Sequence, residues 1–356
     1  DASTRVKSFL KLKKLGLAEK DYPEVRKVSI WLDDHLWKPS GYISIRIATH
    51  KGWVTIEIKP HRQYWRYINR GWKLVSEAKI KLDKRNRQLV IYLTFVKEVE
   101  EYKPRDYLSV DVNESNVTVL VDGVAYLFET NTEKLVLGYH YHRKRIQEKY
   151  DRLYGRRSRI KRKAMRKLKE REKKHDIRWK IANIIVKTAS CKQYAIVLEK
   201  LGRRSANNMT KRVKDKQLRH RIFQANFRGI QRAIEEKARE YGVPVIYVNP
   251  RNTSNLSPIH GASITYSDGS RIGKCSKGGE LWHRDAVACW NLLLKALRGD
   301  GSNALSPVGR SSLDASRIPF GTNATHDPIT LSLRLWARRK SLPQIQHAIV
   351  LNKMKR

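Results

Sequence analysis

Three carboxylates lie where apolar segments of the chain meet polar ones, and they are the residues best suited to do chemistry. Asp111 lies in the apolar run 108–112, Glu199 follows the apolar run 194–198, and Asp285 begins a helical pattern that continues to about residue 297. A carboxylate in an apolar element is costly to bury unless it is paired or binds a metal ion. Mg²⁺ and Mn²⁺ prefer oxygen ligands, and two such ions can stabilise the entering and leaving oxygens of a phosphodiester displacement. Any one carboxylate alone is explained as well by a cap or an ion pair, but the three together predict metal-dependent hydrolysis of nucleic acid.

Four sequence motifs surround these carboxylates. They are D-V-N-E-S-N at 111–116, V-L-E-K-L at 197–201, N-P-R-N-T-S at 249–254 and R-D-A-V-A-C-W-N at 284–291. In this order they resemble the split RuvC nuclease of TnpB (OrfB) proteins, which are encoded by insertion sequences and related to type V CRISPR effectors. The resemblance covers residues 105–297 closely and residues 25–100 more loosely.

The resemblance implies an RNA-guided DNA endonuclease of a transposable element, with an RNase H-like nuclease fold. Asp111, Glu199 and Asp285 would be its catalytic residues and would coordinate two Mg²⁺ ions, with Mn²⁺ as the alternative ion. Guide RNA and target DNA would be its partners. Two other functions stay open: a guide-dependent DNA-binding accessory protein that cuts weakly or not at all, and a guide-independent RuvC-like resolvase or transposase.

The charge balance also favours a nucleic-acid partner. The chain has 75 Lys and Arg against 34 Asp and Glu, a net charge of +41, which a polyanion would neutralise. Its three scattered cysteines favour a reducing compartment over a disulfide framework. The sequence contains neither a bilayer-spanning apolar stretch nor a signal-peptide pattern. We therefore expect a cytoplasmic protein without a membrane partner. Because the sequence begins at Asp1, it has the form of a trimmed or partial product.

The periodicity predicts a chain of mixed α+β and α/β class with two main domains. The expected segments are a basic N-terminal helix (1–24), an antiparallel β-barrel that corresponds to the wedge domain of the resembled family (25–104), a RuvC-like nuclease (105–297), and a linker with a basic C-terminal tail (298–356). Basic helices (138–187) and a degenerate zinc ribbon (253–282) interrupt the nuclease. One helix is expected from 217 to 241, and a short one within 331–356.

Alternating apolar residues predict hairpins in both domains. In the N-terminal domain, residues 43–47 pair with 54–58 and residues 78–82 pair with 89–95. In the nuclease, the Asp122-Gly123 pair predicts a tight turn between strands at 117–121 and 124–128.

Aromatic and basic residues alternate between the two N-terminal hairpins. Arg62, Trp65 and Arg66 belong to this segment, and such a mixture can stack on bases while it pairs with phosphates. Burial of the aromatic rings in the barrel core is an equally good interpretation. In the resembled family this region grips guide RNA and the duplex beside the target.

The segment 138–180 contains nineteen Lys or Arg against five Asp or Glu and has only a thin apolar stripe. Burial alone cannot hold such helices, so we expect them to lie against an RNA–DNA duplex, with a free solvated coiled coil as the alternative. The candidate contact residues here are Arg143, Lys144, Arg156, Arg157, Arg159, Lys161 and Arg162. Arg203 and Arg204, in a loop after Glu199, are further candidates, although an ordinary surface loop explains them equally well.

The segment 253–282 departs from the four-cysteine zinc ribbon of the resembled family. His260 and Cys275 occupy two of the ligand positions, whereas Ser257 and Gly278 cannot supply the other two. A structural zinc site normally needs four ligands. The sequence therefore predicts that zinc is absent and that the ribbon is held by packing or is disordered.

Overall fold

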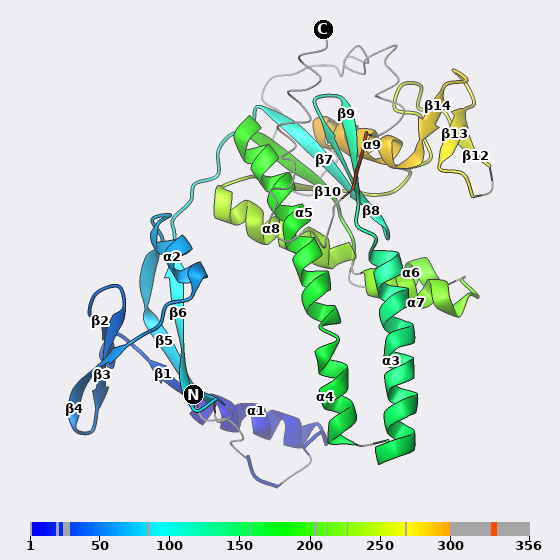
Figure 1. The fold of residues 1–356 in the computed structure, drawn as a ribbon. Coiled ribbons are helices and arrows are strands. Elements are labelled where there is room, and N and C mark those ends of the chain that lie inside the picture. The colour runs from blue at the N-terminus through cyan, green and yellow to red at the C-terminus, as the bar shows by residue number, and fades with distance from the viewer. Residues whose placement is uncertain are drawn as a thin grey trace. The chain divides into compact units, whose positions relative to one another are not determined.

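The computed structural model describes residues 2–18, 21–23, 29–83, 86–156, 158–202, 205–211, 213–225, 227–267, 269–299 and, for the backbone alone, 329–332. These residues belong to two compact units, 1–98 and 99–356, which are drawn in Figure 1. The boundary lies just before the charged segment 100–106, in which the sequence placed it.

The N-terminal unit contains two three-stranded antiparallel sheets and two helices. Its elements are α1 (Ala2–Lys14), β1 (Ser29–Leu32), β2 (Trp37–Pro39), β3 (Ser44–Thr49), β4 (Gly52–Glu57), α2 (Arg62–Ile68), β5 (Lys73–Asp83) and β6 (Gln88–Val96). Both predicted hairpins are confirmed, with Ile45 opposite Ile56 and Ile80 opposite Ile91. The predicted antiparallel barrel is not confirmed, because the described strands pair as two separate sheets, β1-β5-β6 and β2-β3-β4. Alternate residues of the two sheets share one core.

The aromatic and basic segment between these hairpins forms helix α2. Its N-cap is His61, whose Nδ1 accepts a hydrogen bond from the backbone N–H of Gln63. Tyr64 and Tyr67 each pack against Phe95, with ring centroids 5.6 Å apart. Part of the aromatic content thus packs within this unit, although no residue of α2 is buried.

The second unit is built on a mixed six-stranded sheet, with strand order β11-β10-β7-β8-β9-β15. The strands are β7 (Asp106–Val112), β8 (Asn116–Val121), β9 (Val124–Glu129), β10 (Tyr194–Glu199), β11 (Val245–Val248) and β15 (Ile329–Ser332). β7, β8 and β9 form an antiparallel meander, and β10 and β11 add to β7 in parallel. The predicted hairpin at residues 122–123 is confirmed, with positive φ at both residues, as a type I′ turn requires.

Helices cover both faces of this sheet, and others extend away from it (Figure 1). They are α3 (Thr132–Tyr154), α4 (Arg159–Lys167), α5 (Glu170–Lys192), α6 (Ser205–Thr210), α7 (Lys216–Ala225), α8 (Phe227–Tyr241) and α9 (Arg284–Arg298). The basic insertion is confirmed as helical: α3 runs beside α4 and continues through a turn into it (Figure 1). The helix expected over 217–241 is described as two, α7 and α8, on either side of residue 226.

Three short strands form the ribbon that precedes α9. β12 (Ile264–Tyr266), β13 (Ile272–Cys275) and β14 (Leu281–His283) make an antiparallel sheet, with β13 in the middle. The buried side chains of Ile264, Cys275 and Trp282 pack against α9. The ribbon is therefore an ordered part of this unit, and packing contributes to it as predicted.

The C-terminal tail differs from the prediction. Residues 329–332 form strand β15, which pairs in parallel with β9, whereas the sequence predicted only a linker and a short helix within 331–356. The remainder of that predicted helix and the linker residues 300–328 lie outside the described residues.

Candidate active site

Strand periodicity brings Asp111 and Glu199 to one face of the sheet. On β7 and β10 the even-numbered residues, among them Leu108, Val110 and Leu198, pack into a core with α5 and α8. Successive side chains of a strand point to opposite faces, so Asp111 and Glu199 point to the face that α9 covers. Val110 pairs with Leu198 in the parallel ladder, and the two carboxylates follow these residues directly.

Helix α9 supplies the third carboxylate. Asp285 lies in its first turn, and the Asp285 backbone N–H donates to the His283 Nδ1 that caps the helix. Ser109 on β7 donates its hydroxyl to the carbonyl of Cys289, 2.7 Å away, and thereby ties α9 to the centre of the sheet. Asp111 and Asp285 are both buried, with 6% and 2% of their surfaces exposed. The structure thus brings together the three carboxylates that the sequence singled out.

The three carboxylates repel one another. Burial raises the pKa of Asp111 well above its usual value, and the charges of Glu199 and Asp285 raise it further, against a hydrogen bond from Asn113 and the charge of Arg284. Burial also raises the pKa of Glu199, to about 7, while the charge of Lys295 lowers it. Such concentrated buried negative charge is relieved by a bound cation, and the all-oxygen donor set is the one that Mg²⁺ and Mn²⁺ prefer.

A chain of amide side chains connects two of the carboxylates. Asn113 Nδ2 donates to Asp111 Oδ2 over 2.7 Å and to Asn116 Oδ1 over 3.3 Å, and Asn116 Nδ2 donates to Asp285 Oδ2 over 3.3 Å. These hydrogen bonds orient one oxygen of each aspartate. Both asparagines stand in the motif 111–116, which was the signal in the sequence, but their role was not predicted.

Arg271 is a site residue that the sequence did not indicate. Its NH1 lies 2.8 Å from each oxygen of Asp285, and nearly half of the arginine side chain is exposed. Arg271 comes from the ribbon, immediately before β13. A cation from outside the sheet thus covers one of the three carboxylates.

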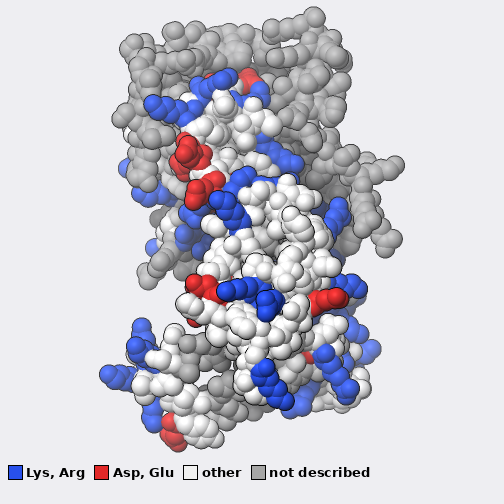
Figure 2. Space-filling view, turned by 90° about the vertical axis from the view of Figure 1, so that its left-hand side faces the viewer, with Lys and Arg blue, Asp and Glu red and all other residues white. Residues whose placement is uncertain are grey.

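The predicted contact residues of the basic helices and of the loop after Glu199 fall into three groups: those in ion pairs, those that are exposed, and those outside the described residues. Arg143 lies 3.5 Å from Glu170, Lys144 lies 3.9 Å from Glu148, and Lys161 pairs with Asp151. Arg156, Arg159 and Arg162 are exposed. Arg157, Arg203 and Arg204 lie outside the described residues. In the coloured part of the face that Figure 2 shows, Lys and Arg side chains are scattered among uncharged residues, and Asp and Glu side chains lie between them.

The predicted contact residues of the N-terminal unit lie on α2. Arg62 and Arg66 are exposed. Trp65 is 38% exposed and packs edge-on against Tyr64, with ring centroids 5.3 Å apart. One side of the indole is therefore packed, while the rest stays accessible.

A second basic region, which the sequence analysis missed, lies between α5 and α8. A cavity of about 1150 Å³ is lined by the cationic residues Arg171, Arg178, Lys200, Arg228 and Arg232, by Trp179, and by the acidic residues Glu235 and Glu236. Burial lowers the pKa of Arg178. Lys200 follows Glu199 directly, so this cavity begins where β10 ends. The sequence indicated α8 only through its packing face, which hid the arginines on its other side.

Comparison with known proteins shows what this chain is similar to. Residues 227–292 match the family model described as the Cas12f1-like TNB domain. The TnpB-like protein MJ0751 of Methanocaldococcus jannaschii is 29% identical over 267 residues, which cover 70% of this chain and 89% of that protein. These matches make the chain similar to TnpB-like proteins and, through the Cas12f1-like domain, to type V effectors. The resemblance predicted from the four motifs is thereby confirmed.

Two further comparisons show how far the similarity extends. The uncharacterised protein MJ0857 of the same organism is 29% identical over 170 residues, which cover 42% of this chain; the chain spans only 61% of that relative. The solved complex of Cas12f1 with a single guide RNA and target DNA superposes with a TM-score of 0.54 at 16% identity, over 81% of this chain and 69% of Cas12f1. At that identity the likeness concerns the fold alone.

None of the described helices is both long enough and apolar enough to cross a membrane.

Proposed function

We propose that this TnpB-like chain is an RNA-guided DNA endonuclease of a transposable element. The observation that carries the proposal is the meeting of Asp111, Glu199 and Asp285 from two strands and one helix on the α9 face of the sheet, where their charges interact. An acidic trio of this kind, with two of its carboxylates buried and Glu199 half-buried, suits metal-dependent phosphodiester hydrolysis. The solved Cas12f1 complex contains guide RNA and target DNA, and this supports the same two partners for this chain.

Asp111, Glu199 and Asp285 would hold two Mg²⁺ ions, and Mn²⁺ fits the same oxygen ligands. When bound, such ions stabilise the charge that develops on the entering and leaving oxygens of the phosphodiester. The chain's own residues prepare this site. Asn113 and Asn116 orient the aspartate oxygens, and α9, tied to Ser109, keeps Asp285 beside the strand ends.

The basic surfaces would hold the nucleic acids. Arg156, Arg159 and Arg162 are exposed on and beside α4, and Arg171, Arg178, Lys200, Arg228 and Arg232 line the cavity at the end of β10. Phosphate contacts by Lys and Arg provide affinity for backbone without reading sequence. Base pairing between guide and target would supply the specificity.

The test is cleavage of DNA that matches the RNA co-purified with the protein. We expect Asp111→Asn to lower the cleavage rate at least about 100-fold, while binding of RNA and target DNA is retained. The matched control is Asp122→Asn, at the exposed turn between β8 and β9. There the carboxylate accepts hydrogen bonds from Lys192 and Tyr194. Full cleavage by Asp111→Asn, with binding intact, would refute the site assignment.

A guide-dependent DNA-binding protein that does not cut is the second candidate, and one observation favours it. Arg271 donates to both oxygens of Asp285 and so competes with a metal ion for them. If wild-type protein binds the matched target but leaves it intact in Mg²⁺ and in Mn²⁺, this second function replaces the first.

A further inference from the structure

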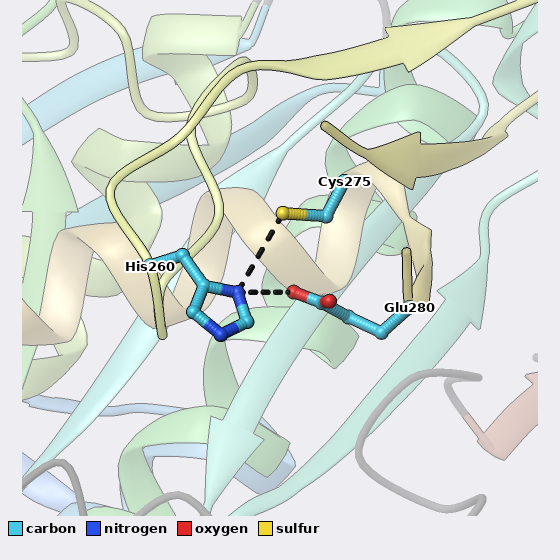
Figure 3. A group of neighbouring side chains, drawn as sticks. All are labelled: His260, Cys275 and Glu280. Carbon is cyan, nitrogen blue, oxygen red and sulfur yellow. Dashed lines mark hydrogen bonds and ion pairs between the residues drawn. The ribbon is translucent and has the colours of Figure 1, made fainter. Parts of the chain in front are cut away.

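Three side chains of the ribbon point toward one another, as Figure 3 shows: His260, Cys275 and Glu280. Their ligand atoms all lie within 4.8 Å of one another, and no other group of three or more His, Cys, Asp or Glu residues in the described part of the chain meets this condition. His260 Nδ1 lies 3.0 Å from Glu280 Oε1 and 3.6 Å from Cys275 Sγ. One imidazole nitrogen thus faces a sulfur and a carboxylate oxygen at the same time.

These separations suit one metal ion. With bonds of about 2.0–2.3 Å from Zn²⁺ to nitrogen, oxygen and sulfur, the corners of a tetrahedron lie roughly 3.3–3.8 Å apart. The two measured separations, 3.0 and 3.6 Å, lie close to this range. The donor set of imidazole, thiolate and carboxylate is one that Zn²⁺ and its neighbours in the transition series accept.

Glu280 replaces the ligand that the sequence analysis found missing at residue 278. An added Cβ on Gly278 would lie 2.1 Å from Glu280 Oε2 and 2.2 Å from the His260 ring. A side chain at residue 278 and the present position of Glu280 are therefore mutually exclusive. The carboxylate comes from two residues further along the chain and occupies the space that glycine leaves open.

The surrounding groups hold these ligands in place. The hydroxyl of Ser257, which is buried, donates to Glu280 Oε1 over 3.0 Å, and the indole N–H of Trp282 donates to the same oxygen over 3.2 Å. Backbone N–H groups of Lys277 and Gly278 donate to the sulfur of Cys275. Hydrogen bonds that orient metal ligands in this way are a regular feature of metal sites.

We propose that His260, Cys275 and Glu280 form a site for one transition-metal ion, in the first place Zn²⁺, with a fourth position open to water. This inference replaces the expectation from the sequence that the ribbon lacks zinc. Three protein ligands leave one coordination position free, and the His260 side chain is 28% exposed, so water can reach the site. The site is separate from the acidic trio and does not depend on the proposed nuclease activity.

The experiment uses Co²⁺ as a coloured probe for this site. The full chain, freed of metal by dialysis against a chelator, is titrated with Co²⁺ while the absorption from thiolate-to-cobalt charge transfer is recorded. We expect this band to grow to one equivalent per chain and to disappear when Zn²⁺ is added. Cys275→Ser should abolish it, whereas the matched control Cys191→Ser, which changes an exposed cysteine, should keep it.

A second variant keeps the test informative if Cys275→Ser fails to fold. Glu280→Gln retains the size of the side chain, and we expect it to weaken Co²⁺ binding at least about tenfold, with an unchanged far-ultraviolet circular dichroism spectrum. The proposal is overturned if wild-type protein gives no charge-transfer band, if the band persists in Cys275→Ser, or if Glu280→Gln binds Co²⁺ as tightly as wild type. Because no step measures cleavage, a failure here leaves the nuclease proposal untouched.

Discussion

The acidic trio (Asp111, Glu199 and Asp285) and the ribbon cluster (His260, Cys275 and Glu280) bring polar groups together in two different ways. At the acidic trio, buried strands and a core helix fix the positions, and the periodicity of β7 and β10 decides which side chains meet. At the ribbon cluster, two turns bring His260 and Glu280 to Cys275 at the end of β13. The alternation of apolar residues indicates which side chains meet at a site on core elements. A site on turns depends on local backbone geometry, which that alternation does not reveal.

The largest expected difference between the two sites concerns the metal that each prefers. We expect chelation with EDTA to abolish DNA cleavage and added Mg²⁺ or Mn²⁺ to restore it, because the trio offers only oxygen ligands. A large excess of Mg²⁺ should leave the cobalt–thiolate band of the ribbon unchanged, because Mg²⁺ binds thiolate poorly. Cleavage that persists after complete chelation, or loss of the cobalt–thiolate band on addition of Mg²⁺, would contradict this difference in metal preference.

Stability should also separate the two regions. Leu198 is fully buried between the sheet and α5 and α8, and we expect Leu198→Ala to lower the free energy of unfolding by about 2–5 kcal/mol. Leu281 on β14 of the ribbon is 59% exposed, and Leu281→Ala should change that free energy by less than about 0.5 kcal/mol. Urea denaturation of each variant measures both values. Equal losses would mean that core packing does not dominate at β10.

Arg271 is the point where the ribbon meets the acidic trio, and removing it sharpens the contrast. Because Arg271 occupies both oxygens of Asp285, we expect Arg271→Ala to lower the Mg²⁺ concentration for half-maximal cleavage several-fold. Lys274→Ala, an exposed cation on the adjoining strand β13, is the matched control. A higher Mg²⁺ requirement in Arg271→Ala would instead make the arginine a supporting part of the site.

The smallest effects are expected on the basic helices. Arg162 is exposed, so Arg162→Ala should weaken RNA binding and reduce the slope of log affinity against log salt by about 1. The adjacent Lys161 already pairs with Asp151, and Lys161→Ala should change that slope less. Filter binding at several salt concentrations distinguishes them, and identical slopes for both variants would contradict this assignment.

The sequence was informative where periodicity determines structure. Alternating residues predicted the hairpins at Ile45 and Ile80, and the apolar runs before Asp111 and Glu199 marked strands whose polar ends could meet. The faces were decided by chain geometry alone, since every second residue of a strand points the same way. These features were predictable because they depend on local spacing.

The sequence was uninformative where distant groups meet by the course of turns. Nothing in the spacing of Arg271 and Asp285 indicates a contact between them, and Glu280 lies outside the motif positions that were tested for zinc ligands. The single barrel expected in the N-terminal unit became two sheets because hydrogen-bond pairing between hairpins, unlike pairing within one, is not encoded in alternation. The pairing of β15 with β9 is missed for the same reason.

The alternation on β7 has a consequence for how this chain can vary. A substitution at a core position such as Leu108 changes packing, but Asp111 still points toward α9. A single residue inserted or deleted between Asp106 and Asp111 would turn that carboxylate toward α5 and α8 and place an aliphatic side chain among Glu199 and Asp285. Changes of length in this strand are therefore far less tolerable than changes of residue type, and related chains should share the strand's length even where they differ in its composition.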